Sequence, residues 1–192
     1  MTFVEFLLAN GDENLAQYLE QVDTLEPIPD AFFNPLYEKL KMYYVTGGMP
    51  ELVLMWTEAR DVSAMQEALS GIIGAYERDF ANHPNLSEFP KISMIWKSIP
   101  SQLARGNNPP YEVDFLIQRE NDIFPVEVKS EANTTSKSMK KFKELFPDKV
   151  KLRIRFSLDN LKLDDDVLNI LLFMADQADQ LIGLALEQGS AQ

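Results

Sequence analysis

The chain contains no cysteine and only one histidine. Without cysteine it cannot form a disulfide, a thiolate metal site or a cysteine nucleophile. The single histidine, His83, stands between an asparagine and a proline, where a surface loop residue is expected. No Ser/His/Asp or Cys/His set can be assembled around it, so triad hydrolysis and thiol chemistry are both excluded.

Long apolar runs and a leader-like start are also absent. No run reaches the roughly 18 apolar residues that a membrane span requires. The first residues, MTFVEFLLANGDEN, lack the basic segment and the small-residue cleavage site of a secretory signal. We therefore expect a soluble cytoplasmic protein with no membrane contact.

Basic side chains are scarce overall. The chain has 18 Lys and Arg against 30 Asp and Glu, a net charge of −12, which argues against non-specific binding to nucleic acid. Residues 129–155 are the exception, because they contain nine basic and three acidic side chains, a net charge of +6. A solvated helix and strand face is the first interpretation of this basic region, and contact with a phosphate backbone is the second.

Helical periodicity dominates the first 104 residues. The apolar spacing predicts a helix pair over residues 2–21 and further helices over about 34–46, 50–57, 61–80 and 92–103. Thr2 and Glu5 fit a capping box, and Pro50 suits the first turn of a helix. Trp56 and Trp96 lie at helical spacing among apolar neighbours, so both are expected in the core.

A change of character follows at residues 105–110, RGNNPP, which read as a linker. Beyond it the patterns predict strands over about 111–118, 123–129 and 149–156, a basic helix over 135–146 and a closing helix over 165–187. The run Asp164–Asp166 is interpreted as the capped start of that last helix. We therefore predict an α+β fold: a helical bundle over 1–104, a linker over 105–110, and a small mixed sheet with flanking helices over 111–192.

The stretch YEVDFLIQRENDIFPVEVKSE, residues 111–131, places three charged residues inside apolar runs. Glu127 and Lys129 are two apart and share one face of a strand. In a hairpin the positions of opposed residues have a constant sum. A sum of 241 sets Asp114 opposite Glu127, and a sum of 243 sets it opposite Lys129. A sum of 242 sets it opposite Val128 and separates the three, so two of three registers gather the charges on one face.

Two carboxylates beside a lysine suit a hard divalent cation. Asp114 and Glu127 would provide oxygen ligands for Mg²⁺, and Lys129 would orient an attacking water or offset charge on a phosphate. The alternative is a surface hairpin whose charges pair across the strands. Spacing alone favours that alternative, whereas the succession of hairpin, basic helix and strand favours a site.

This succession resembles the PD-(D/E)xK nuclease superfamily, in which the Asp and the E-x-K stand on a β-hairpin of an α-β-β-β-α-β core. Asp114, Glu127 and Lys129 match those positions. Three segments of the sequence resemble the C-terminal region of prokaryotic AAA-type ATPases that end in a nuclease-like domain of unknown function (domain of unknown function 4143). They are VDFLIQ, FPVEVKSEANTTSKSMKKF and LDDDVLNI. YVTGGMPELV and YERDFANH resemble the helical region that follows the ATPase core of the same proteins.

The resemblance also defines what is missing. The chain has no G-x-x-x-x-G-K-[ST] loop, so we expect no ATP binding. Six residues, 105–110, stand where the family has a winged-helix-like region and the first helix and strand of the nuclease-like fold. The chain therefore resembles a shortened relative, and the first hypothesis is a non-catalytic module that binds a protein partner or itself.

The second hypothesis is a Mg²⁺-dependent nuclease that cuts DNA or RNA with Asp114, Glu127 and Lys129. The nucleic acid would then lie along the basic region, on Lys137, Lys140, Lys141 and Lys143. Glu112 or Glu131 would be a candidate for a third acidic ligand.

Overall fold

The computed structural model describes residues 1–82, 89–103, 113–119, 121–129 and 137–190. The contacts within the chain divide it into two compact units. The first unit combines Met1–Val45 with Pro109–Gln192, and the second unit is Thr46–Asn108. The N-terminal helices therefore share a unit with the C-terminal sheet.

Three helices form the N-terminal part of the first unit: α1 (Phe3–Ala9), α2 (Glu13–Glu20) and α3 (Asp30–Thr46). The Thr2 hydroxyl accepts a hydrogen bond from the Glu5 N–H, and the Glu5 carboxylate accepts one from the Thr2 N–H. The predicted capping box is therefore present. Gly11, with a φ of +74°, separates α1 from α2. The helix pair predicted over residues 2–21 is confirmed, and the helix predicted from residue 34 begins four residues earlier.

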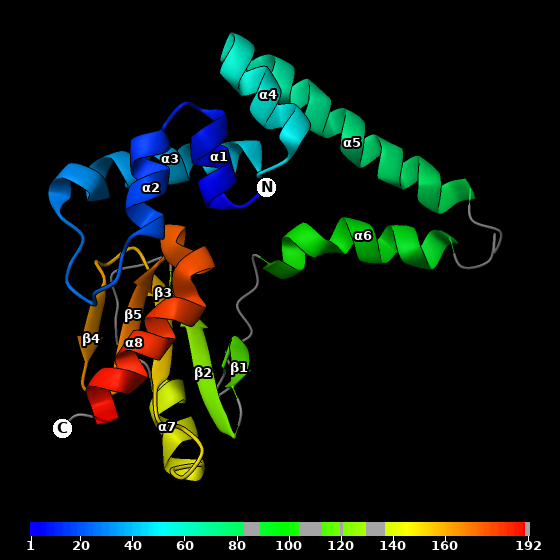
Figure 1. Ribbon diagram of the computed structural model, residues 1–192. Coiled ribbons are helices and arrows are strands. Elements are labelled where there is room, and N and C mark those ends of the chain that lie inside the picture. Colours follow the sequence, from blue (N-terminus) through cyan, green and yellow to red (C-terminus); the bar gives the residue numbers. More distant parts are fainter. Residues whose placement is uncertain (83–88, 104–112, 120, 130–136, 191–192) are drawn as a thin grey trace. The chain divides into compact units, whose positions relative to one another are not determined.

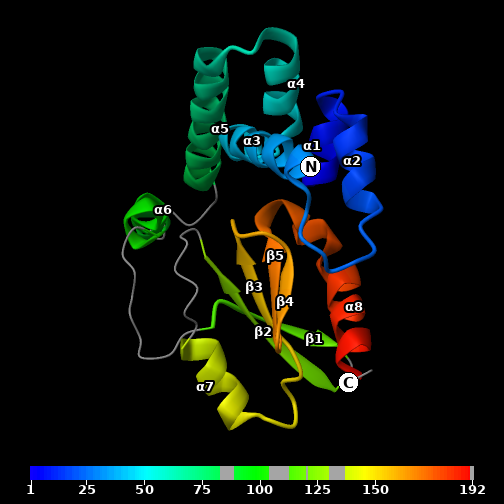
Figure 2. The same ribbon diagram turned by 90° about the vertical axis from the view of Figure 1, so that its left-hand side faces the viewer.

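A mixed sheet forms the rest of the first unit (Figure 1). Its described strands are β1 (Phe115–Arg119), β2 (Asp122–Val128), β3 (Arg153–Ser157), β4 (Lys162–Asp164) and β5 (Val167–Leu171), in the order β1-β2-β3-β5-β4. Strands β2, β3 and β5 are parallel, and β1 and β4 are antiparallel edges. Helix α7 (Lys137–Leu145) provides the crossover from β2 to β3. Figure 2 shows α7 and α8 (Ala178–Ser190) on opposite sides of the sheet. The predicted α+β class is confirmed.

The strand register gives the central sheet an apolar and a polar face. One aligned row across β2, β3 and β5 consists of Val126, Ile154 and Leu168, all of which are buried. The next row consists of Glu127, Arg155 and Asn169. Because side chains alternate along a strand, these two rows point to opposite faces. The sequence therefore directs Glu127 to a polar face inside an otherwise apolar strand.

The helix predicted over residues 165–187 is wrong in its first half. Residues 162–171 form the β4–β5 hairpin, the 3₁₀ helix η1 (Leu172–Gln177) follows, and α8 begins only at Ala178. Asp165 adopts a φ of +55° in the two-residue turn, so the run of aspartates is a turn and not a helix cap. The apolar residues after it gain a parallel neighbour in β3, and this pairing overrides the helical spacing of the sequence.

Helices α1–α3 pack on the segment that follows β5. The rings of Phe3 and Phe33 lie 6.2 and 6.1 Å from the ring of Phe173 in η1. The side chain of Asn160 hydrogen-bonds both the N–H and the carbonyl of Ile28, each at 2.8 Å. The compact units consequently differ from the predicted division into 1–104 and 111–192, because the first three helices bury their aromatic side chains against the sheet unit.

The second unit contains α4 (Pro50–Ala59), α5 (Val62–Asn82) and α6 (Phe89–Leu103), close to the three helices predicted there. Pro50 occupies the first turn of α4 as expected. The ring of Trp96 in α6 lies 6.1 Å from Tyr76 and 5.2 Å from Phe80, both in α5. Trp96 and Trp56 are half-buried. None of the described helices is long and apolar enough to cross a membrane.

Candidate functional site

The β1–β2 hairpin has the first of the three registers considered. Phe115 pairs with Val126, and Arg119 pairs with Asp122, so the positions sum to 241. In this register Asp114 is predicted opposite Glu127, but the paired residues end at Phe115 and Val126. Asp114 itself lies just before β1, and its N–H donates to the Val126 carbonyl at 3.1 Å.

The Asp114 carboxylate is bound to the backbone of the neighbouring strand. Its Oδ2 accepts a hydrogen bond of 2.7 Å from the N–H of Val128. That N–H belongs to the Glu127–Val128 peptide, so the carboxylate of Asp114 lies beside the backbone of Glu127. The side chain of Asp114 is exposed. Its observed contact is that of a side chain that fastens the edge strand to β2.

Glu127 is a buried acid, with 7% of its surface exposed. Its Oε1 forms an ion pair with Lys129 Nζ at 2.9 Å. Its Oε2 is buried and has no hydrogen-bond partner in the part of the chain that the structure describes. A buried carboxylate oxygen without a partner is costly, and such oxygens are frequently the ones that a cation or a proton donor meets.

The residues fit a divalent cation only in part. Asp114 and Glu127 are hard oxygen donors on adjacent strands, as Mg²⁺ prefers. Among the residues that the structure describes, however, no three acidic or histidine side chains form a group that could hold a metal ion. Glu112 and Glu131, the candidates for a third ligand, lie outside the described residues. So do residues 133–136, where the start of the basic helix would meet a phosphate.

Comparison with known families bears on the segment that contains the trio. Residues 100–173 match the family model described as domain of unknown function DUF4143. Residues 37–112 match a second model, domain of unknown function DUF8612. The two matches overlap over 100–112, which includes the predicted linker at 105–110. No curated protein and no solved structure matches the chain.

The DUF4143 segment contains all five described strands and α7. It therefore includes Asp114, Glu127 and Lys129, together with the whole basic region. The DUF8612 match contains α4, α5 and α6, the three helices of the second unit. The segments that resemble the nuclease-like domain thus lie in the DUF4143 match. The segments YVTGGMPELV and YERDFANH lie in the DUF8612 match.

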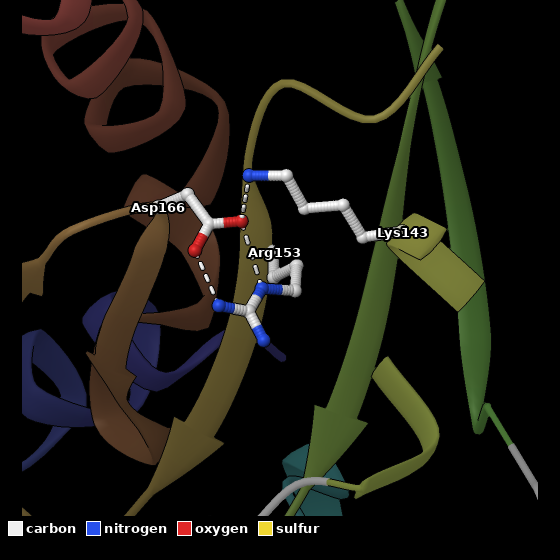
Figure 3. Close-up of polar contacts among 3 residues, drawn as sticks. All are labelled: Lys143, Arg153 and Asp166. Atoms are coloured by element: carbon white, nitrogen blue, oxygen red, sulfur yellow. Dashed lines mark hydrogen bonds and ion pairs between the residues drawn. The ribbon is translucent and has the colours of Figure 1, made fainter. Parts of the chain in front are cut away.

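The strongest polar cluster of the DUF4143 segment is centred on Asp166, which sequence reasoning assigned to a helix cap. Figure 3 shows the Asp166 carboxylate between the side chains of Arg153 and Lys143. Arg153 binds both carboxylate oxygens, and Lys143 Nζ lies 2.5 Å from Oδ2. Burial alone would raise the pKa of the Asp166 carboxyl, but the hydrogen bonds from Arg153 and Lys143 hold it below its ordinary value.

Two of the four predicted nucleic-acid-binding lysines are held in ion pairs, and the other two are exposed. Lys143 is bound to Asp166, and Lys141 pairs with Glu144 at 3.2 Å. Lys137 and Lys140 are exposed. Of the nine basic side chains in residues 129–155, five form ion pairs: Lys129, Lys141, Lys143, Lys151 and Arg153. Three of the partner acids, Glu127, Asp122 and Asp166, lie outside residues 129–155, so these ion pairs offset three of the six positive charges.

A pocket of about 380 Å³ opens beside β4 and β5. Its lining is mixed in charge and consists of Arg155, Asp159, Asn160, Lys162, Asp164, Val167 and Asn169. Asn169 is bound on all sides, since its Oδ1 accepts from Ser157 and its Nδ2 donates to the carbonyls of Asp159 and Asn160. The pocket is thus mainly the outer side of a structural hydrogen-bond network. No sequence signal indicated it, because its residues meet only through strand pairing.

Proposed function

We propose that this chain is a non-catalytic protein-interaction module, a shortened cytoplasmic relative of the AAA-ATPase/nuclease-like proteins with no ATP binding of its own. One observation carries the proposal, namely an apolar surface left exposed on α5 and α6. We name it the α5–α6 stripe and define it as Val62, Ile73 and Tyr76 of α5 with Ile92, Ile95 and Ile99 of α6. Each of the six side chains is 38–63% exposed.

The members of the stripe on each helix share one side of that helix. At about 100° per residue, the three members on α5 fall within roughly 60° of one another, and so do the three on α6. Exposed apolar side chains that gather on one side of a helix indicate a binding surface more often than scattered ones do. A surface of this kind typically receives another protein.

The contacts of the charged trio support the non-catalytic part of the proposal. Asp114 is engaged with the backbone of Val128, and one oxygen of Glu127 is neutralised by Lys129. The first contact ties the segment before β1 to β2, and the second joins neighbours two residues apart along one strand, as in a structural hairpin. Five of the nine basic side chains in residues 129–155 are held in ion pairs, which reduces the number that could meet phosphates.

The proposal is tested by comparing the proteins that bind to the wild-type chain with those that bind to two matched variants. Ile95→Glu places a charge in the stripe, whereas Met94→Glu places one on the adjacent residue, which is 73% exposed and points to another side of α6. Proteins recovered from an extract of the producing cells should be shared by the wild type and Met94→Glu and lost with Ile95→Glu. Equal recovery by all three chains would contradict the proposal.

A second candidate function, a Mg²⁺-dependent nuclease, is favoured by the Oε2 of buried Glu127, which has no hydrogen-bond partner among the described residues. In that case Asp114 and Glu127 would hold the cation, which would supply an activated water and stabilise charge on the phosphate. Lys129 would orient the water, and Lys137 and Lys140 would contact the nucleic acid. The same three residues that now form contacts within the hairpin would then contact substrate and metal.

Cleavage assays separate the two functions. Under the interaction hypothesis, the chain does not cut DNA or RNA with Mg²⁺ or Mn²⁺, and Glu127→Gln leaves that result unchanged. Under the nuclease hypothesis, Glu127→Gln and Asp114→Asn abolish cleavage, whereas Asp122→Asn, an acid on the same strand paired with Lys151, does not. Far-ultraviolet circular dichroism of each variant checks that the fold is intact.

A further inference from the structure

The two edges of the described sheet differ in their protection against pairing with another chain. Strand β4 is three residues long and carries Lys162 and Asp164, which pair with each other at 3.0 Å. A short, charged strand is a common protection of a sheet edge. Strand β1 forms the other edge (Figure 1), is five residues long and has the sequence FLIQR. Its first three residues are apolar, so most of this edge lacks that protection.

The exposed apolar side chains of β1 lie on both faces of the sheet. Phe115 is 64% exposed and is aligned with Val126, a member of the apolar row. Leu116 is 56% exposed and points to the opposite face, the one that contains Glu127. A partner that docks on one face would cover only one of these two side chains. A strand added along the edge covers both, because its own side chains alternate between the same two faces.

A second copy of β1 fits this edge in one register. In an antiparallel pair related by a two-fold axis perpendicular to the sheet, each side chain keeps its face. Opposed positions are then both odd or both even, so that their sum is even. Among the even sums, only 234 pairs all five residues of β1. The axis then passes between the two copies of Ile117.

We propose that β1 pairs antiparallel with β1 of a second copy of this chain, so that two sheets continue into one across a two-fold axis. The proposed interaction function concerns the α5–α6 stripe of the second unit, and the β1 edge is a separate contact surface on the first unit. The register supports a second copy as the occupant, because it sets Phe115 opposite the partner's Arg119. An arginine beside an aromatic ring is a favourable pair, and none of the five pairs opposes like charges.

The side chain of Arg119 is available for this pair. Its Nη1 lies 3.8 Å from the Asp179 carboxylate of α8, and both side chains are exposed. A long, exposed ion pair of this kind contributes little to the stability of the isolated chain. Phe115 and Arg119 are four residues apart and share one face of β1. Each copy therefore provides one ring and one guanidinium group, and two equal pairs flank the axis.

The first test is sedimentation equilibrium of the whole chain with two leucine variants. Leu116→Lys places a lysine, which protects natural sheet edges, in β1, and Leu54→Lys makes the same change on α4 at the same exposed fraction of 56%. The wild type and Leu54→Lys should dimerise alike, and Leu116→Lys should raise the dimer dissociation constant about tenfold or more. Both dilute variants should keep the thermal midpoint of the dilute wild type, because both leucines are exposed. A monomeric wild type, or equal dimerisation of the two variants, would overturn the inference.

The second test examines the register through position 115. Phe115→Arg sets an arginine opposite the partner's Arg119, whereas Phe115→Glu sets a carboxylate there. Both variants lose the same ring, so their comparison isolates the charge. At low salt the glutamate variant should dimerise about tenfold more tightly than the arginine variant, and high salt should reduce the difference. The net charge of −12 acts in the opposite direction, since it favours association of the arginine variant. Equal or tighter dimerisation of the arginine variant would overturn the proposed pairing.

Hydrogen exchange distinguishes the β1 edge from the α5–α6 stripe as the dimer contact. Raising the protein concentration through the dimer dissociation constant should slow exchange at backbone amides of β1 and leave those of α5 and α6 unchanged. Ile95→Glu, which places a charge in the stripe, should dimerise like the wild type. Loss of dimerisation in Ile95→Glu, or slower exchange confined to α5 and α6, would assign the dimer to the stripe. Either result would overturn the β1 pairing and leave the proposed interaction function in place.

Discussion

At the scale of single residues, Asp166 is the side chain on which the DUF4143 segment depends most for charge balance. It is buried and binds Arg153 and Lys143, which come from a strand and from a helix. Removing one member of such a buried ion cluster leaves the other charges without compensation, which costs more than the net value of the intact cluster. Asp166 is therefore a structural acid, although it belongs to a run that resembles a cation-binding motif.

We predict that Asp166→Asn lowers the free energy of unfolding by about 1.5–3 kcal/mol at neutral pH, because charged hydrogen bonds to Arg153 and Lys143 are lost. The pKa of Asp166 is depressed in the folded state, so its contribution is complete above the ordinary Asp pKa of about 4 and is lost as the pH falls through the lower folded value. Urea denaturation from pH 7 to pH 3 should show the difference between wild type and variant shrinking below about pH 4.

The matched control is Asp165→Asn. Asp165 is exposed and has a positive φ, which asparagine also adopts readily. This variant should change the free energy of unfolding by less than about 0.5 kcal/mol. A loss at Asp165 as large as that at Asp166 would mean that the turn, rather than the ion cluster, sustains the stability.

At the scale of elements, the β4–β5 hairpin is the feature that departs most from expectation. Leu168 is fully buried and pairs with Ile154 of β3 and with Leu163 of β4. The same residues have spacing compatible with a helix, so the choice between strand and helix depends on a neighbouring strand that is distant in sequence. The turn at Asp165 and Asp166 is what allows the chain to reverse and take up that pairing.

We predict that Asp165→Val destabilises the chain by about 1–2 kcal/mol, since a β-branched residue is strained at a φ of +55°. Asp165→Gly, at the same position, should be neutral or slightly stabilising because glycine adopts this conformation without strain. Thermal unfolding of both variants measures the difference. Equal midpoints for the valine and glycine variants would argue that the turn relaxes to a different conformation.

At the scale of the molecule, the first unit joins segments from opposite ends of the chain. The Asn160 side chain binds both backbone polar groups of Ile28, and Phe173 contacts rings of α1 and α3. Helices α1–α3 and the sheet therefore form one compact unit. Helices α4–α6, which lie within the DUF8612 match, form the other unit.

We predict that Asn160→Ala costs about 1–3 kcal/mol, because it leaves the buried backbone groups of Ile28 without partners. Hydrogen exchange should accelerate at the Ile28 amide as well as near residue 160. Asn14→Ala, at an exposed position of α2, is the matched control and should change neither stability nor exchange. If exchange accelerated only at amides near residue 160, the N-terminal helices would pack on the sheet without this hydrogen-bond link.

How much of this could be predicted is clearest from particular residues. Thr2, Glu5 and Pro50 specify helix starts through contacts within a few residues, so their positions follow from sequence alone. The hairpin follows from the turn and the alternation around it, but its register does not, because three registers fit the same residues and only the strand pairing distinguishes them. The partners of Asp166 and Asn160 could not be predicted, because they approach only when strands and helices distant in sequence pack together.

The sequence by itself determined the helical character of the first 104 residues, the β1–β2 hairpin and the placement of Glu127 and Lys129 on one face, because helix and strand periodicities are local properties of the chain. Tertiary structure alone decided that residues 162–171 form a hairpin, that α1–α3 join the sheet and that Asp166 binds Arg153 and Lys143. Those outcomes depend on which apolar surfaces meet, and burial of a surface is a property of the assembled chain and not of any one segment.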